Sequence, residues 1–128
     1  MEIQIIPFRA RHVPLIRPDA GPEWIDLAEE AQEGGRGYTA CLLGDPIGAA
    51  GVRVHGNGIG EAWALFSPLL KTMPKALFKN VSKGLNEIIV EEKLKKIWAL
   101  VDPEDEIAQR FIERLGFHMK HWIYEKEL

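Results

Sequence analysis

The chain has 128 residues, of which 46% are hydrophobic and 27% charged, and a formal net charge of −3. A chain of this length forms one ordinary domain that buries roughly two-thirds of its unfolded surface, so we expect a single domain over residues 1–128. Because the chain has no excess of basic residues, its charge argues against a nucleic-acid partner. Its single cysteine excludes an intrachain disulfide. No apolar run approaches the ~18 residues that are needed to span a bilayer. These features predict a cytoplasmic protein with no membrane partner.

Charge is distributed unevenly along the chain. Residues 1–70 hold five Arg, no Lys and nine acidic residues, whereas residues 71–128 hold nine Lys and two Arg against ten acidic residues. In the second part, four lysines stand four residues apart with no acidic residue among them: Lys71, Lys75, Lys79 and Lys83. On a helix, this spacing places all four on one face.

The N-terminal half alternates extended and helical patterns. Its predicted elements are, in chain order, a strand over 2–8, a short helix over 10–16, a helix from Pro22 to about Gln32, and strands over 37–44, 47–56 and 60–67. Gly34 and Gly35 end the longer helix. Gly56-Asn57-Gly58 lies between two extended runs, which predicts a hairpin turn rather than a nucleotide-binding loop.

The C-terminal half predicts two helices that connect strands. Its elements are a helix from Pro74 to about Glu92, a strand over 95–101, a helix opened by Pro103 and ended by Leu115-Gly116, and one or two strands over 117–128. We therefore expect an α/β (α+β) fold with a mixed central sheet of six to seven strands and helices on both faces. The strands over 60–67 and 95–101 should run parallel and diverge at their C-terminal ends, because a helical crossover joins them.

The segment from Asp105 to Phe117 carries the most specific pattern in the chain. It resembles the Asn-x-x-Ala-x-x-x-Tyr-x-x-x-Gly-Phe motif of the GNAT superfamily of acyl-CoA-dependent N-acyltransferases, with Ala108, Gly116 and Phe117 on the matching positions. Alanine allows close packing of helix on sheet, glycine supplies a left-handed stop, and phenylalanine begins a buried strand. An unrelated helix–glycine–strand corner is the alternative reading.

The resemblance implies acetyl-CoA as co-substrate, no metal, and a small-molecule or protein amine as acceptor. It places the co-substrate against Leu65, Phe66 and Ser67, against the loop that follows them, and against Ala108. Three positions depart from the family pattern: Ile112 replaces the tyrosine that protonates the departing thiolate, Asp105 replaces the asparagine, and residues 67–76 contain no glycine where the family has a glycine-rich pyrophosphate loop. Pro74 also removes one backbone donor from that loop.

The lysines at the start of the crossover helix could replace the missing loop. Lys71 and Lys75 can bind phosphate as point charges, and Thr72 can cap the helix or donate to a phosphate oxygen. The alternative is that all four lysines form the solvated face of an amphipathic helix. We favour the solvated face for Lys79 and Lys83, and both readings stay open for Lys71 and Lys75.

Acyl transfer to an amine needs a base. The resemblance favours Glu61, on the fourth strand, although a carboxylate beside a hairpin also has a purely structural reading. Asp102 follows the fifth strand, where ligands bind in open α/β sheets, but an aspartate before proline commonly caps a helix. Tyr38 and Tyr124 are the only tyrosines that could replace the acid missing at position 112.

Two hypotheses of different classes follow from these features. The first is a CoA-dependent N-acyltransferase whose activity on generic amines is weak. The second is a non-catalytic protein that keeps the fold and serves as a binding or structural component. Short, glycine-poor versions of this fold are similar to phage-encoded proteins that include internal virion components, which would make the chain virion-associated. A homodimer is compatible with either hypothesis.

Overall fold

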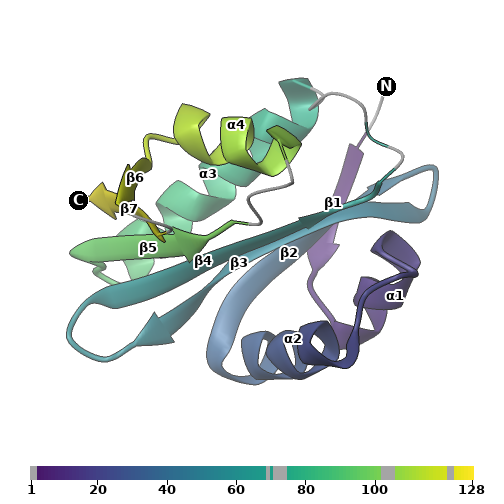
Figure 1. Ribbon diagram of the computed structural model, residues 1–128, viewed down its shortest axis with the longest axis horizontal. Coiled ribbons are helices and arrows are strands. Elements are labelled where there is room, and N and C mark those ends of the chain that lie inside the picture. The colour runs from purple at the N-terminus through teal and green to yellow at the C-terminus, as the bar shows by residue number, and fades with distance from the viewer. Residues whose placement is uncertain (1–2, 69, 71–74, 102–105, 121–122) are drawn as a thin grey trace.

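The structure is a computed structural model that describes residues 3–68, 70, 75–101, 106–120 and 123–128. Figure 1 shows its elements in chain order. The strands are β1 (Ile3–Pro7), β2 (Gly35–Leu42), β3 (Asp45–His55), β4 (Ile59–Phe66), β5 (Lys96–Leu100), β6 (His118–Lys120) and β7 (Ile123–Glu127). The helices are the 3₁₀ helix η1 (Ala10–His12), α1 (Val13–Ile16), α2 (Pro22–Gly34), α3 (Lys75–Glu91) and α4 (Glu106–Arg114).

The strands of the described residues form one mixed sheet in the order β1-β2-β3-β4-β5-β7-β6. Neighbours from β1 to β4 pair antiparallel, β4 and β5 pair parallel, and β7 pairs antiparallel with both β5 and β6. The predicted α/β class with a mixed sheet is confirmed. The parallel pairing of β4 with β5 is confirmed as well, because α3 is the crossover between them.

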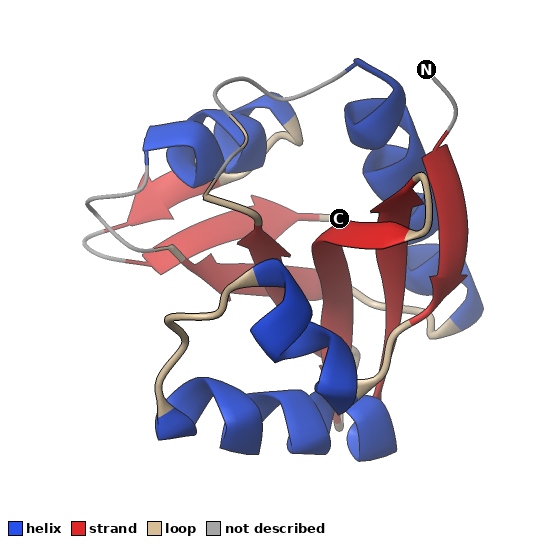
Figure 2. Ribbon diagram, turned by 90° about the vertical axis from the view of Figure 1, so that its right-hand side faces the viewer, coloured by secondary structure: helices blue, strands red, loops and turns tan. Residues whose placement is uncertain are grey.

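Helices cover both faces of the sheet. In Figure 1, α3 and α4 lie above the strands and α1 and α2 lie below them, and Figure 2 shows the strands as a middle layer between helices. Each face has its own buried core. On the α3 and α4 face the largest buried side chains include Phe66, Leu77, Ile88, Ile97, Phe111 and Phe117. On the α1 and α2 face the buried core residues are Phe8, Val13, Ile16, Ala28, Ala31, Ala49 and Leu65.

Two predicted turns have the backbone that their residues allow. Asn57 and Gly58 adopt φ values of 65° and 74°, and the three-residue connection between β3 and β4 sets Arg53 opposite Glu61. Gly116 adopts φ +96° two residues after the last residue of α4, where the motif predicted the left-handed stop, and the next residue, Phe117, is buried. Left-handed φ values favour glycine and asparagine, so these turns follow from the sequence.

The ring of Trp63 lies across two glycines on neighbouring strands. Gly37 of β2, Gly51 of β3 and Trp63 of β4 are register partners. A Cβ atom would lie 2.9 Å from Trp63 Cζ2 at Gly37 and 2.8 Å from it at Gly51. At Gly51 it would also lie 2.7 Å from the Cα of Gly37, which is backbone that cannot rotate away. The glycines therefore make the space that the indole occupies.

Gly51→Ala is expected to lower the free energy of unfolding by about 1–3 kcal/mol or more, because the added methyl group overpacks against backbone. Gly34→Ala is the matched control: Gly34 lies at the end of α2 and a Cβ there would meet nothing within 4 Å. That control should be neutral or stabilising by up to about 1 kcal/mol. Urea denaturation of both variants tests the expectation, and equal stability of the two would contradict it.

Candidate functional site

The sheet divides between β4 and β5. Their parallel ladder joins Ile59–Ala62 to Lys96–Ala99 and ends there, although β4 continues to Phe66. β3 remains paired with β4 along that whole remainder, and β7 pairs with all of β5. The edge of β4 from Trp63 to Phe66 that faces away from β3 therefore has no strand partner among the described residues. This is the divergence that the sequence predicted.

A cavity of about 350 Å³ lies at this divergence, on the face covered by α1 and α2. We call it the α2 cavity. Most of the described residues that form its walls are apolar: Phe8, Val13, Trp24, Leu27, Ala28, Ala31, Ala62, Trp63, Leu65 and Val101. Phe8 and Trp63 pack ring against ring with centroids 4.6 Å apart. The Trp63 Nε1 atom is buried without a hydrogen-bond partner among the described residues, so Trp63 contributes its ring surface rather than its N–H group.

Two charged residues, Arg53 and Glu61, line the α2 cavity. Arg53 Nη1 lies 3.2 Å from Glu61 Oε2, and Arg53 Nη2 lies 2.9 Å from Glu30 Oε2 on α2. His55 Nε2 lies 3.2 Å from the same Glu61 Oε2. The Glu61 side chain is only 15% exposed, whereas that of Glu30 is 59% exposed. Glu61 is thus the inner carboxylate of an ion-paired cluster.

The two carboxylate oxygens of Glu61 have different surroundings. Each contact that the structure gives Glu61 falls on Oε2, and Oε1 has no partner among the residues that the structure describes. One oxygen is therefore held by Arg53 and His55, while the other can accept a hydrogen bond from a ligand. The sequence placed Glu61 on the right strand but did not identify Arg53 and His55 as its partners.

The other predicted residues of β4 contribute in different ways. Leu65 faces α1 and α2 and lines the α2 cavity, whereas Phe66 is buried on the opposite face. The Ser67 N–H donates to the Ile47 carbonyl oxygen at 2.9 Å, and the Ser67 carbonyl oxygen accepts from the Leu70 N–H at 3.1 Å. Ala108 is half-buried on α4. Asp102, Lys71 and Thr72 lie outside the described residues.

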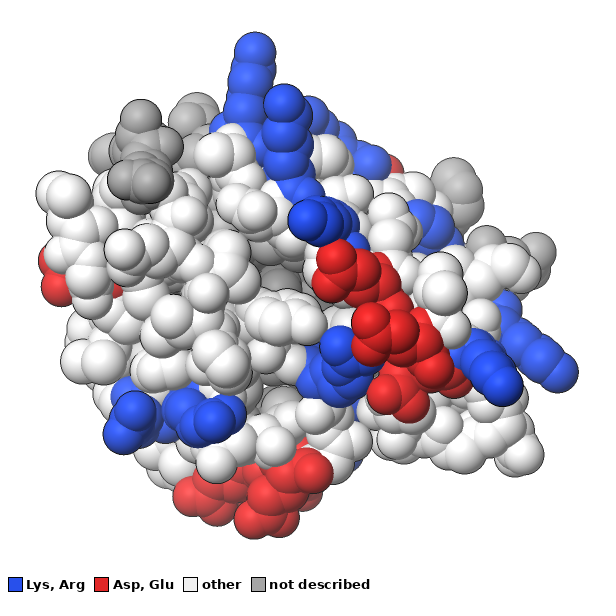
Figure 3. All heavy atoms as spheres, turned by 180° about the vertical axis from the view of Figure 1, so that it is seen from behind, with Lys and Arg blue, Asp and Glu red and all other residues white. Residues whose placement is uncertain are grey.

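Helix α3 has basic residues near its N-terminus and acidic residues near its C-terminus, which is the unfavourable arrangement for the helix dipole. Lys75 is its first residue, and Lys75, Lys79 and Lys83 are exposed, while Glu87 and Glu91 are exposed toward its C-terminus. In Figure 3, basic side chains run down from the top of the molecule and meet a cluster of acidic ones. A helix favours the reverse arrangement, with acidic residues in its first turn. These three lysines make no ion pair with any described residue.

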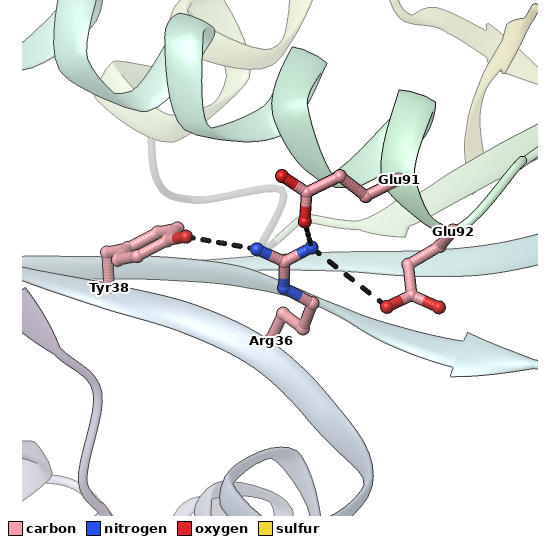
Figure 4. Close-up of polar contacts among 4 residues, drawn as sticks. All are labelled: Arg36, Tyr38, Glu91 and Glu92. Atoms are coloured by element: carbon pink, nitrogen blue, oxygen red, sulfur yellow. Dashed lines mark hydrogen bonds and ion pairs between the residues drawn. The ribbon is translucent and has the colours of Figure 1, made fainter.

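At the other end of α3 the acidic residues do have a partner. Figure 4 shows Arg36 of β2 reaching Glu91 and Glu92 at the end of α3 and Tyr38 on its own strand. Arg36 Nη1 pairs with Glu91 and lies 4.0 Å from Glu92 Oε1, and Arg36 Nη2 donates to the Tyr38 hydroxyl at 3.3 Å. Since β3 separates β2 from β4, Tyr38 does not lie at the divergence.

A buried polar pair that the sequence did not reveal lies close to the α2 cavity. His12 is 6% exposed, and its Nδ1 atom lies 2.8 Å from Thr39 Oγ1 and 3.1 Å from the Arg9 backbone nitrogen that donates to it. Since Nδ1 accepts, His12 is neutral with its proton on Nε2. Burial, with the nearby Arg11 and Arg9 charges, lowers the pKa of His12 below its ordinary value of 6.5. His12 therefore acts as a core residue.

The stability of the protein should fall as the pH drops below about 6.5, because the unfolded chain then binds a proton at His12 that the folded chain resists. The contribution is complete above the unfolded pKa and is lost as the pH approaches the lower folded value. Urea denaturation at pH 8, 7, 6 and 5 measures it. In His12→Gln the slope should be smaller than in the wild type, and identical slopes would contradict the expectation.

The described residues contain neither a candidate metal centre nor a candidate membrane-spanning helix. That part of the chain contains no group of three or more His, Cys, Asp or Glu side chains placed to hold a metal ion. None of its helices is long and apolar enough to cross a membrane.

Comparison with known proteins gives one kind of match. Neither models of known protein families nor curated protein sequences match the chain. Solved structures do. The ribosomal-protein-S5-alanine acetyltransferase of Vibrio fischeri matches with a TM-score of 0.71 at 11% identity, covering 99% of this chain and 93% of that one. An IAA acetyltransferase from Bacillus cereus matches with a TM-score of 0.70 at 13% identity, covering 99% and 100%.

A third match was solved with bound ligands. An aminoglycoside acetyltransferase in complex with coenzyme A and kanamycin has a TM-score of 0.64 at 20% identity, covering 98% of this chain and 95% of that one. At sequence identities of 11–20%, the structural similarity to these proteins establishes the fold alone. The chain has the GNAT fold, as its C-terminal motif predicted.

Proposed function

We propose that the protein is a GNAT-superfamily N-acetyltransferase that uses acetyl-CoA and holds its amine acceptor in the α2 cavity. The observation that carries the proposal is the coincidence of three features: the divergence of β4 from β5, the cavity beside it, and a carboxylate in that cavity with one unpartnered oxygen. Several structures that share the fold were solved with coenzyme A, which supports the choice of co-substrate. One sheet joins both cores, which supports a single domain over residues 1–128.

The residues at the divergence fit coenzyme A. The unpartnered edge of β4 presents extended backbone, which can pair with the two amide groups of a pantetheine arm as it would with an added strand. Leu65 and Phe66 belong to this edge. The first turn of α3 contains no acidic residue, so Lys75 and the helix N-terminus supply positive potential for the pyrophosphate, with Lys71 and Thr72 as further proposed ligands. Ala108 is the proposed contact from α4.

Bound acetyl-CoA would supply the acetyl group as a reactive thioester. The chain's own residues act on the amine. Glu61 Oε1 accepts a hydrogen bond and then a proton from the acceptor ammonium, directly or through water, which frees the nitrogen lone pair for attack. Arg53 holds Oε2 at 3.2 Å and so fixes the orientation of the carboxylate. Asp102 is the alternative proposed base.

No side chain at position 112 can protonate the departing thiolate, because Ile112 is 5% exposed in the apolar core between α4 and the sheet. A free thiol has a pKa of about 8.5, so a thiolate is a tolerable leaving group near neutral pH and its protonation is helpful rather than obligatory. The missing acid therefore predicts slow turnover rather than an inactive protein.

Calorimetry with acetyl-CoA tests the proposal. We expect micromolar binding. Absence of binding up to millimolar concentration would overturn the proposal and leave a GNAT fold without catalysis, such as a binding protein or a phage structural component. The oligomeric state, measured in the same samples by light scattering, would show whether the acetyl-CoA complex is a homodimer.

A further inference from the structure

From the walls and charges of the α2 cavity, we infer that the acceptor is a primary monoamine with a single flat apolar substituent, of the arylalkylamine class. This inference rests on the proposed function and narrows its substrate class. Among the described residues that line the cavity, ten are apolar and two, Arg53 and Glu61, are charged. Such a site binds a ligand with an apolar body and one polar group.

The shape of the apolar part favours a flat group. Trp24 from α2 and Trp63 from β4 both line the cavity, and Phe8 packs against Trp63. Aromatic rings pack well against other flat rings in offset or edge-to-face arrangements. Ala28 and Ala31, both buried on α2, add little side-chain volume and so leave space beside these rings. A volume of about 350 Å³ lies at the small end of ligand-binding pockets, which excludes large acceptors.

The charge of the cluster favours one ammonium group. Glu30, Arg53 and Glu61 together carry one net negative charge when His55 is counted as neutral. One ammonium placed at Glu61 Oε1 neutralises it. A polyamine or an aminoglycoside would bring further ammonium groups against walls whose other described residues are apolar and offer them no partner, at a high desolvation cost. The acceptor therefore differs in class from the kanamycin in the aminoglycoside acetyltransferase structure.

Calorimetry on the full chain without acetyl-CoA tests this inference. The probes are 2-phenylethylamine, 2-phenylethanol, which lacks the ammonium group, and spermidine, which lacks the ring. We expect 2-phenylethylamine to bind at least tenfold more tightly than either of the other two. Failure of 2-phenylethylamine to bind, or equal binding of spermidine, would overturn the inference.

A matched pair of variants on α2 locates the binding. Leu27 and Ile25 are both apolar and about equally exposed, at 40% and 43%, but only Leu27 lines the α2 cavity. Leu27→Lys places a cation at the cavity and should weaken binding of 2-phenylethylamine at least tenfold, while Ile25→Lys should change it less than twofold. Both positions are exposed, so both variants should fold. Equal effects of the two would also overturn the inference.

Acetyl-CoA binding is measured separately in the same protein preparation. It distinguishes failure of the substrate class from failure of the acetyltransferase proposal. If acetyl-CoA binds and 2-phenylethylamine does not, the substrate class is wrong and the acetyltransferase proposal stands. If 2-phenylethylamine binds at the α2 cavity and acetyl-CoA does not, the cavity is an amine-binding site and the acetyltransferase proposal is wrong.

Discussion

Glu61→Gln is expected to lower kcat/KM for acetyl transfer by about 10²- to 10⁴-fold, the usual contribution of a general base. The amide keeps the shape of the side chain and can still lie beside Arg53, but it cannot take up a proton. The pH–rate profile separates this role from a structural one, because removal of the base should abolish the fall in rate on the acidic side of the wild-type profile. Initial rates with acetyl-CoA and 2-phenylethylamine measure both quantities.

Two controls accompany Glu61→Gln. Glu30→Gln removes the outer carboxylate of the same cluster, 59% exposed, and should have a much smaller effect on the rate. Asp102→Asn should also cost less than Glu61→Gln, because Glu61 lines the cavity that is proposed to hold the amine. Robust turnover that survives Glu61→Gln would show that the base has been misassigned.

The partner of Glu61 could have been predicted from the sequence. The turn at Gly56-Asn57-Gly58 fixes the register of the hairpin, and a three-residue connection places Arg53 opposite Glu61 on one face of the sheet. The glycines at positions 37 and 51, isolated within strands, likewise signal that a large side chain approaches the backbone. Both signals are local and can be read by counting residues.

The α2 cavity could not have been predicted in this way. Its walls come from the loop after β1, from α1 and α2, from β3 and β4, and from the residue after β5, and no local pattern reports how far these segments stand apart. The ion pair of Arg53 with Glu30 and the contact of His12 with Thr39 depend on the same tertiary packing. Leu27 is 40% exposed although it lines the cavity, so its apolar character alone does not reveal its position.

The arrangement of charges along α3 helps to distinguish two roles for its lysines, a solvated helix face or the binding of an anionic ligand. A surface selected only for solubility and helix stability would place acidic residues in the first turn of α3, and it has none. At the C-terminal end, Arg36 offsets the unfavourable Glu91 and Glu92. At the N-terminal end, Lys75 has no described partner that offsets its charge. An anionic ligand would supply that partner.

Lys71→Ala combined with Lys75→Ala is therefore expected to weaken acetyl-CoA binding by about 10- to 100-fold, the loss expected when one or two hydrogen bonds to charged groups are removed. The difference from wild type should shrink as the salt concentration rises, because exposed charge pairs are screened. Lys79→Ala combined with Lys83→Ala is the matched control, with the same change in charge farther along the helix, and should leave affinity nearly unchanged. Unchanged affinity in the first double variant would assign Lys71 and Lys75 to the solvated face as well.

Lys75→Glu gives the sharper result, because its effects on binding and on stability should have opposite signs. Glutamate in the first turn of α3 suits the helix dipole, so the free energy of unfolding should rise by about 0.3–1 kcal/mol. Acetyl-CoA affinity should fall further than in Lys75→Ala, since the variant repels the phosphates instead of merely losing their attraction. Urea denaturation and calorimetry on one preparation measure both effects. A lysine that belongs only to a solvated face would give the gain in stability without the loss in affinity.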